Sequence, residues 1–271
     1  MILVSCRRDF DSNHRFSDGN EIRDYPNLQK LDDYEFMEPD ELVDDVRGQH
    51  VLVLVHGYRN PLQNVAPAYR LVEQKLKKHG LVGEGGYDRV IGFLWPGFET
   101  VFGFVLAVPW ANRSAGFLRS LLMRLGSSTS TIDIQTHSLG ARVALQALAF
   151  PQDVWVDNLM LTAPAVDNES LEPGKEFHPA LDSCRRCFVY HSSRDRVLRV
   201  SYRIGAWDKA LGYKGPENPD VIAEDVDQVF VADCSAVVRS HGGYRRADRY
   251  CEHWGRVLRD EPLEQFEKLK A

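Results

Sequence analysis

The 271-residue sequence has no apolar run long enough to cross a membrane. Its longest apolar stretch, residues 101–111, is about half the length that a membrane-spanning helix needs, and it contains Pro109. The first residues, MILVSCRRDF, show neither the basic start nor the apolar core of a secretory signal. We therefore expect no transmembrane segment and no export by that route.

Cysteine is scarce as well. The five cysteines are an odd number in a chain large enough to fold without disulfides, so reduced thiols in the cytoplasm are the simplest interpretation. Two of them form the motif CRRC at Cys184 and Cys187, but no second pair of ligands stands at the spacing of a structural zinc site. We expect these two thiols to be structural and predict no metal.

A surplus of positive charge is also missing, because 33 Lys and Arg stand against 39 Asp and Glu, for a net charge of −6. This balance disfavours nucleic acid as the main partner, since phosphate binding needs clustered positive charge. No repeat or low-complexity tract interrupts the chain. Hydrophobic residues make up 44% and charged residues 27%, which is typical of a soluble globular protein. One domain over residues 1–271 is expected.

Apolar strands and helical patterns alternate along the chain. The continuous branched aliphatic run VLVLVHG is typical of a strand buried on both faces of a parallel sheet. Residues 1–50 are acidic and rich in turns, so we expect a peripheral segment with strands at MILVSC and YEFM. The six main predicted strands are residues 51–57, 89–96, 131–136, 158–164, 187–193 and 228–234.

Helical patterns lie between these strands. Lys, Lys, His and Gly end one pattern and favour a helix C-terminus, and a second pattern gathers its leucines on one face. Such alternation predicts an α/β fold with a mostly parallel central sheet and helices on both faces. The predicted helices are residues 66–80, 112–126, 139–150 and 247–260. Two long stretches, 97–126 and 196–227, are candidates for a cap or pocket wall, although the apolar start of the first also suits ordinary core.

The stretch TIDIQTHSLGARVALQALAF, residues 131–150, predicts a strand, a sharp corner at Ser138 and a helix. A corner that presents a serine nucleophile needs small residues two positions away on both sides, so that strand and helix can approach. Gly140 meets this need on the helix side, whereas Thr136 replaces the small residue on the strand side. The alternative is that Ser138 only caps the helix.

An acyl-transfer serine needs a base and an orienting carboxylate from the ends of other strands. Asp195 follows the strand at 187–193, and His241 lies in a glycine-rich loop after the last strand, which gives the chain order serine, acid, histidine. A surface ion pair with Arg194 or Arg196 is the alternative for Asp195.

Other titratable residues are placed less well. Asp167 is the reserve carboxylate. We expect a structural or packing role for three histidines: His56, His191 and His253. Three further carboxylates are less well placed than Asp195 and Asp167: Asp225, Asp227 and Asp233.

An oxyanion hole can also be located. The segment VLVLVHGYRN ends its strand in His-Gly, the corner from which such enzymes supply one backbone N–H, so Tyr58 is the expected donor. Leu139 directly follows Ser138 at the start of a helix and is the expected second donor.

The motifs VLVLVHGY, GFLWP, THSLGARVAL, LTAPAVD, SSRDRVL and SHGGY together resemble the α/β-hydrolase superfamily over residues 50–260. They are most similar to its poorly characterised bacterial group with the serine motif H-S-x-G. This resemblance implies an α/β-hydrolase fold with Ser138 as nucleophile, Asp195 as acid, His241 as base, and an oxyanion hole at Tyr58 and Leu139.

The expected function is cleavage of a small-molecule carboxylic ester through an acyl-enzyme, with amides and lipid esters as further options and no cofactor. Thr136 favours the alternative of a binding or scaffold protein without turnover. The apolar residues 97–110 favour a third possibility, a lipase that acts at membrane surfaces. Six arginines near the proposed acid and base suit either an anionic substrate or, as we expect, surface ion pairs: Arg194, Arg196, Arg199, Arg203, Arg245 and Arg246.

Overall fold

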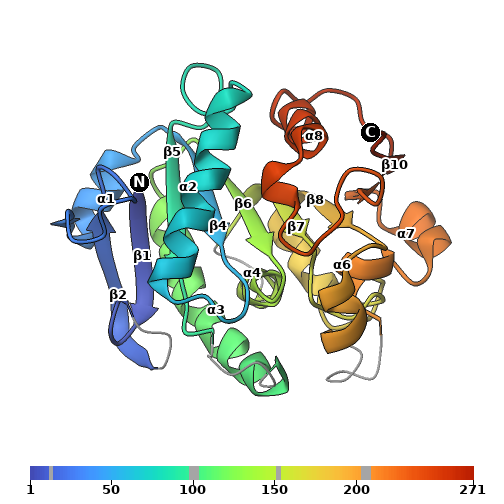
Figure 1. The fold of residues 1–271 in the computed structure, drawn as a ribbon, viewed down its shortest axis with the longest axis horizontal. Helices are drawn as coiled ribbons and strands as arrows, with labels where there is room; N and C mark the ends of the chain where they lie inside the picture. Colours follow the sequence, from blue (N-terminus) through green and yellow to red (C-terminus); the bar gives the residue numbers. More distant parts are fainter. Residues whose placement is uncertain (12–14, 98–103, 151–153, 203–208) are drawn as a thin grey trace.

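The computed structural model describes residues 1–11, 15–97, 104–150, 154–202 and 209–271, which form one sheet with helices packed against it (Figure 1). The strands are β1 (Ile2–Arg7), β2 (Phe16–Asp24), β3 (Glu35–Phe36), β4 (His50–Val55), β5 (Arg89–Leu94), β6 (Thr131–His137), β7 (Val156–Thr162), β8 (Cys184–His191), β9 (Val229–Asp233) and β10 (Phe266–Lys268). The helices are α1 (Pro39–Asp45), α2 (Leu62–Lys78), α3 (Phe104–Gly126), α4 (Gly140–Leu148), α6 (Leu211–Lys214), α7 (Pro219–Asp225) and α8 (Asp248–Leu258), with short turns η1 (His178–Ser183), η2 (Leu198–Tyr202) and η3 (Tyr244–Arg246).

The strand order across the sheet is β10-β9-β8-β7-β6-β4-β5-β1-β2-β3. Every neighbouring pair from β10 to β1 is parallel, while β2 pairs antiparallel with both β1 and β3. The six main predicted strands are confirmed as β4 to β9. Strand β1 is buried along its whole length beside β5, and β2 and β3 extend the sheet to its edge.

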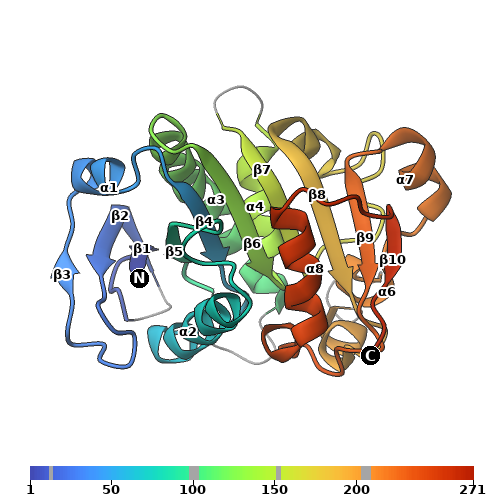
Figure 2. The same ribbon diagram turned by 90° about the horizontal axis from the view of Figure 1, so that it is seen from above.

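Helices α2 and α8 cover one face of the sheet, and α3 and α4 cover the other (Figure 2). With both faces covered, the central strands can be apolar throughout, and residues 51–55 of β4 are at most 1% exposed. The predicted mostly parallel α/β architecture is confirmed. Among the described residues, no helix combines the length and apolar character needed to cross a membrane.

Helix α3 begins earlier than the predicted start at residue 112. It starts at Phe104 and contains Pro109. Proline cannot donate to the carbonyl four residues earlier, but so close to the helix start this removes only one bond from a long ladder. The predicted cap at 97–126 falls partly on residues 98–103, and the predicted wall at 196–227 partly on residues 203–208, all outside the described residues.

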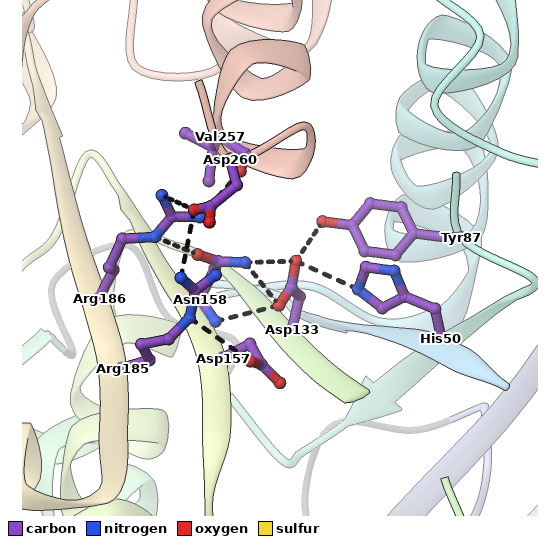
Figure 3. A network of polar contacts seen from close by, with 9 residues as sticks. All are labelled: His50, Tyr87, Asp133, Asp157, Asn158, Arg185, Arg186, Val257 and Asp260. Carbon is purple, nitrogen blue, oxygen red and sulfur yellow. Dashed lines mark hydrogen bonds and ion pairs between the residues drawn. The ribbon is translucent and has the colours of Figure 1, made fainter. Parts of the chain in front are cut away.

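A buried carboxylate links strands on the face covered by α2 and α8 (Figure 3). Asp133 of β6 is completely buried and accepts a 2.7 Å hydrogen bond from the Tyr87 hydroxyl. The backbone N–H of Asn158 on β7 donates to it at 3.0 Å, and the Asn158 side chain donates at 2.9 Å. These bonds satisfy a charge that would otherwise be costly to bury.

Arg186 of β8 extends this network to α8 (Figure 3). It donates to the Asn158 side-chain oxygen at 3.0 Å and to the Val257 carbonyl at 2.8 Å. It also forms a 2.7 Å ion pair with Asp260, just after α8. Helix α8 is therefore fastened to the sheet by polar contacts in addition to its apolar face.

All five cysteines are buried and free of disulfides. Cys184 and Cys187 lie in β8, where burial raises the pKa of Cys184 to about 12 and holds the pKa of Cys187 well above its usual value. Both side chains are therefore neutral thiols at physiological pH.

Candidate active site

Ser138 lies at a sharp corner between β6 and α4. Its φ of 56° is in the left-handed region, which is costly for a residue with a Cβ and is often found at functional sites. Its N–H donates to the Thr162 carbonyl at 3.0 Å, and its carbonyl accepts from the Ala165 N–H at 3.1 Å. Bonds to the adjacent β7 and to the segment after it thus hold this strained backbone in place.

Two glycines allow the backbones to meet around this corner. A Cβ on Gly140 would lie only 2.4 Å from the His56 carbonyl oxygen, and one on Gly57 would lie 2.9 Å from the Ser138 Cβ. The segment after β4 therefore packs directly against Ser138. Thr136 fits within this arrangement, because its side chain is completely buried and its hydroxyl donates to the Met160 carbonyl at 3.4 Å.

The alternative role of Ser138 as a helix cap does not match the geometry. The N-cap of α4 is Leu139, with no side-chain capping bond. The Leu139 N–H lies at the very start of the helix, where backbone N–H groups lack an acceptor within the helix. Tyr58, the other expected oxyanion donor, follows Gly57 at the contact with Ser138.

Asp195 and His241 meet beyond the ends of β8 and β9. Asp195 is 1% exposed, and one of its carboxylate oxygens accepts from the His241 Nδ1 at 2.7 Å. The other oxygen accepts from the backbone N–H groups of Val197 and Leu198, both at 3.0 Å. These contacts exclude the alternative of a surface ion pair and fix the carboxylate against the imidazole.

His137 is a neighbour of His241 that the sequence reasoning missed. Its Nε2 donates to the His241 carbonyl at 2.9 Å, and the two rings lie 4.6 Å apart. Burial, together with the adjacent His241, holds the pKa of His137 well below its usual value, so its ring stays neutral. The residue before Ser138 therefore contacts the loop that carries His241. In the sequence, only its position next to Ser138 indicated that His137 could belong to the site.

Within the described residues, no hydrogen bond joins the Ser138 hydroxyl to His241. The reserve carboxylate Asp167 lies in an isolated β-bridge with Ala210. The expected packing histidine His253 is 4% exposed and accepts from the Tyr190 hydroxyl at 3.0 Å.

His56 supports the corner that carries Tyr58. It is stacked on Trp95 with ring centroids 5.5 Å apart, and its Nδ1 donates to the Gly57 carbonyl at 2.7 Å. Its Nε2 accepts from the Trp95 N–H at 3.1 Å and lies 3.0 Å from a guanidinium nitrogen of Arg7. Burial and the neighbouring Arg7 hold the pKa of His56 well below its usual value. This ring is therefore a neutral structural element, as expected.

Arg7 is a further residue that the sequence reasoning missed. It is completely buried, and its side chain donates to the Trp95 carbonyl at 3.0 Å and to the Asn60 carbonyl at 2.6 Å. Burial lowers the pKa of Arg7 to about 10, so it remains charged at neutral pH. Through these bonds β1 holds the segments that follow β4 and β5.

A cavity of about 60 Å³ lies close to these histidines. Its polar lining includes His137 and Gln135 of β6, and Arg245 and Tyr250 form part of its wall. At this size it holds water or a small substituent rather than a whole acyl chain.

The chain was also compared with known protein families and sequences. A family model described as "Alpha/beta hydrolase of unknown function (DUF900)" matches residues 35–239. A comparison with curated protein sequences finds no match.

Several solved structures are similar to the chain, among them the three that follow. Esterase PE8 has 16% sequence identity and a TM-score of 0.47, covering 80% of this chain and 94% of its own. The product of the gene lin2722 from Listeria innocua has 11% identity and a TM-score of 0.47, covering 82% and 99%. The esterase Pf2001 from Pyrococcus furiosus has 15% identity and a TM-score of 0.43, covering 89% and 86%.

Proposed function

This chain belongs to the α/β-hydrolase family whose model it matches over residues 35–239, and we propose that it is a serine hydrolase that cleaves a carboxylic ester. The observation that carries the proposal is the buried contact between Asp195 and His241 at the sheet edge where Ser138 occupies a strained corner. A buried carboxylate–imidazole pair beside a serine at a strand end is the arrangement that activates a serine. Residues 1–271 form one catalytic domain in this proposal.

In the proposed mechanism, the Ser138 Oγ attacks the ester carbonyl and its proton passes to the Nε2 of His241. This nitrogen is free to accept because the Nδ1–H already donates to Asp195. The imidazolium that forms is stabilised by the carboxylate and then returns its proton to the leaving alkoxide. Water hydrolyses the acyl-enzyme by the same path, without a cofactor.

Backbone N–H donors stabilise the negative charge that develops on the substrate oxygen. The N–H groups of Tyr58 and Leu139 are the proposed oxyanion hole, since Leu139 follows Ser138 directly and Tyr58 follows Gly57, which packs against Ser138. Each such donor contributes about 3–4 kcal/mol to the transition state. The bond from His137 to the His241 carbonyl holds the base in position during these steps.

Labelling with a fluorophosphonate probe tests the proposal. We expect the wild type to be labelled between pH 6 and 9, Ser138→Ala to lose labelling, and the exposed control Ser127→Ala to retain it. A folded wild type that is neither labelled nor active on a panel of esters and amides of graded chain length would overturn it. That result would instead favour a binding protein without turnover.

The proposal extends to the location of the protein and to lipid esters as substrates. Buried, free cysteines suit a reducing compartment, so we propose a cytoplasmic location. Lipid esters enter as a substrate class only if activity rises at a lipid interface, which the same ester panel tests when vesicles are added.

A further inference from the structure

A basic hollow lies beside the proposed catalytic acid. It has a volume of about 490 Å³ and is lined by Ser193, Arg194, Asp195, Arg196, Arg199 and Arg239. The four arginine side chains are exposed, three on the turn after β8 and one after β9. Two segments that are distant in sequence thus place four positive charges around one depression, on a protein whose net charge is −6.

Three of these arginines, Arg194, Arg196 and Arg199, do not form the surface ion pairs that the sequence favoured. Within the described ranges, no carboxylate pairs with any of the four. Asp195 also lines the hollow, but it is 1% exposed and its oxygens accept from His241 and two backbone N–H groups. Elsewhere the chain does pair its arginines, for example Arg89 with Asp45 at 2.7 Å. Among the residues that the structure describes, the four like charges of the hollow therefore have no counterion.

We propose that this hollow binds a phosphate group. Arginine presents a planar fork of N–H donors that matches phosphate oxygens, and several forks around one depression provide both charge and hydrogen bonds. A bound phosphate relieves the mutual repulsion of the guanidinium groups, which favours its retention. The hollow adjoins the proposed catalytic acid, but binding of phosphate there does not depend on the proposed hydrolysis.

Two exposed valines bear on the source of the phosphate. Val197 is 48% exposed and Val200 is 54% exposed, and both lie on the same turn as Arg196 and Arg199. Apolar side chains between basic ones suit the headgroup region of an anionic bilayer, where the valines enter the acyl boundary. A soluble phosphate ester needs only the arginines. The bound chemistry is the same in both cases, and the experiment separates the two sources.

The test measures binding, with the full chain, of inorganic phosphate by calorimetry and of vesicles by sedimentation. The vesicles contain phosphatidylcholine with or without phosphatidylglycerol. We expect the double variant Arg196→Gln/Arg199→Gln to weaken phosphate binding at least tenfold. The control Arg8→Gln/Arg124→Gln removes two exposed arginines elsewhere, with the same change of charge, and should leave binding within twofold of the wild type.

A third variant, Val197→Ser/Val200→Ser, separates the sources. If this variant loses binding to anionic vesicles but still binds phosphate, the bound group is a lipid headgroup. If the wild type binds phosphate but neither kind of vesicle, the bound group is a soluble phosphate ester. Absence of both kinds of binding at low salt overturns the proposal. Equal weakening in the control pair overturns it too, because the effect would then follow from net charge alone.

Discussion

Asp195 is the buried carboxylate that determines how His241 is oriented. Its two oxygens are fully engaged, one by the imidazole and the other by two backbone N–H groups. Because those N–H groups fix the carboxylate, the imidazole must keep its Nδ1–H toward it. A neutral side chain at this position could not stabilise the imidazolium of the proposed proton transfer.

The first prediction concerns this charge. Asp195→Asn preserves the shape of the side chain but removes its charge and can place an amide N–H against Nδ1, which favours the wrong tautomer. We expect kcat for ester hydrolysis to fall by about 10⁴-fold, with the far-ultraviolet circular dichroism unchanged. Asp225→Asn is the control, since Asp225 is exposed at the end of α7. A loss of less than tenfold for Asp195→Asn would show that the carboxylate is not needed.

The sequence could predict some of these residues because the chain order of serine, acid and histidine follows from strand succession. It could not predict Arg7, whose partner His56 lies 49 residues away, directly after β4, a strand that is not a neighbour of β1. The hydrophobic periodicity of the sequence gives no information about a contact between residues so far apart. His137 could have been predicted as a site residue, since it is next to Ser138. Its bond to the His241 carbonyl could not, because it depends on where a loop distant in the sequence lies in the fold.

At the scale of elements, the approach of α4 to β4 depends on Gly140. We predict that Gly140→Ala forces the helix away from the strand, because the new Cβ would lie 2.4 Å from the His56 carbonyl and 2.6 Å from the Val55 carbonyl. The expected loss is about 1–3 kcal/mol in the free energy of unfolding, together with most of the labelling of Ser138. Urea denaturation and the fluorophosphonate probe measure the two effects.

Gly116→Ala is the matched control for this change. Gly116 lies in α3, and a Cβ added there would point into open space, so the substitution should stabilise the helix by up to about 1 kcal/mol. If both variants had the same stability, the close contact at Gly140 would not constrain the corner.

Strand prediction succeeded where burial is uniform. The continuous apolar run of β4 reflects coverage of both faces, and the shorter apolar runs within β5 to β9 were sufficient to place those strands. The start of α3 could not be predicted, because Pro109 argues against a helix that in fact contains it. The placement of β1 also escaped prediction, since its parallel partner β5 is more than eighty residues away and pairing across such a distance leaves no local signal.

Two adjacent arginines on β8 provide the third prediction. Arg186→Met should lower the free energy of unfolding by about 2–4 kcal/mol, because it leaves the Asn158 side-chain oxygen and the Val257 carbonyl without their donor. Arg185→Met should cost less than about 1 kcal/mol, since Arg185 is more exposed and bonds only carboxylates. Urea denaturation of both variants provides the comparison. Equal losses would mean that the network of Figure 3 adds nothing beyond surface pairing.

At the scale of the whole molecule, the two ends of the parallel strands carry different groups of polar residues. The C-terminal ends of the parallel strands carry Ser138, the Asp195–His241 pair and the basic hollow. Further back, the network around Asp133 and Arg186 joins β6, β7 and β8 to α8. Three neutral histidines lie within these parts of the fold, His56 and His137 near Ser138 and His253 in α8, and their protonation opposes folding.

The last prediction is that the protein loses stability as the pH falls below neutrality. Burial holds the pKa of His56 and of His137 well below the usual 6.5 and lowers that of His253 to about 4. Below pH 6.5 the unfolded chain therefore binds protons that the folded chain does not. Stability is fully present above pH 6.5 and is lost as the pH falls toward the folded-state pKa values, by up to about 1.4 kcal/mol per pH unit for each histidine.

Urea denaturation at pH 7.5, 6.5, 5.5 and 4.5 measures this slope. His253→Gln should reduce the slope by up to one histidine's share, because glutamine can still accept from the Tyr190 hydroxyl but does not take up a proton. The variant is expected to be less stable than the wild type at pH 7.5, since it packs less well, and closer to it at pH 4.5. A free energy of unfolding that stays constant from pH 7.5 to 5.5 would contradict the assignment of these rings as buried and neutral, because three depressed histidine pKa values cannot coexist with a flat profile.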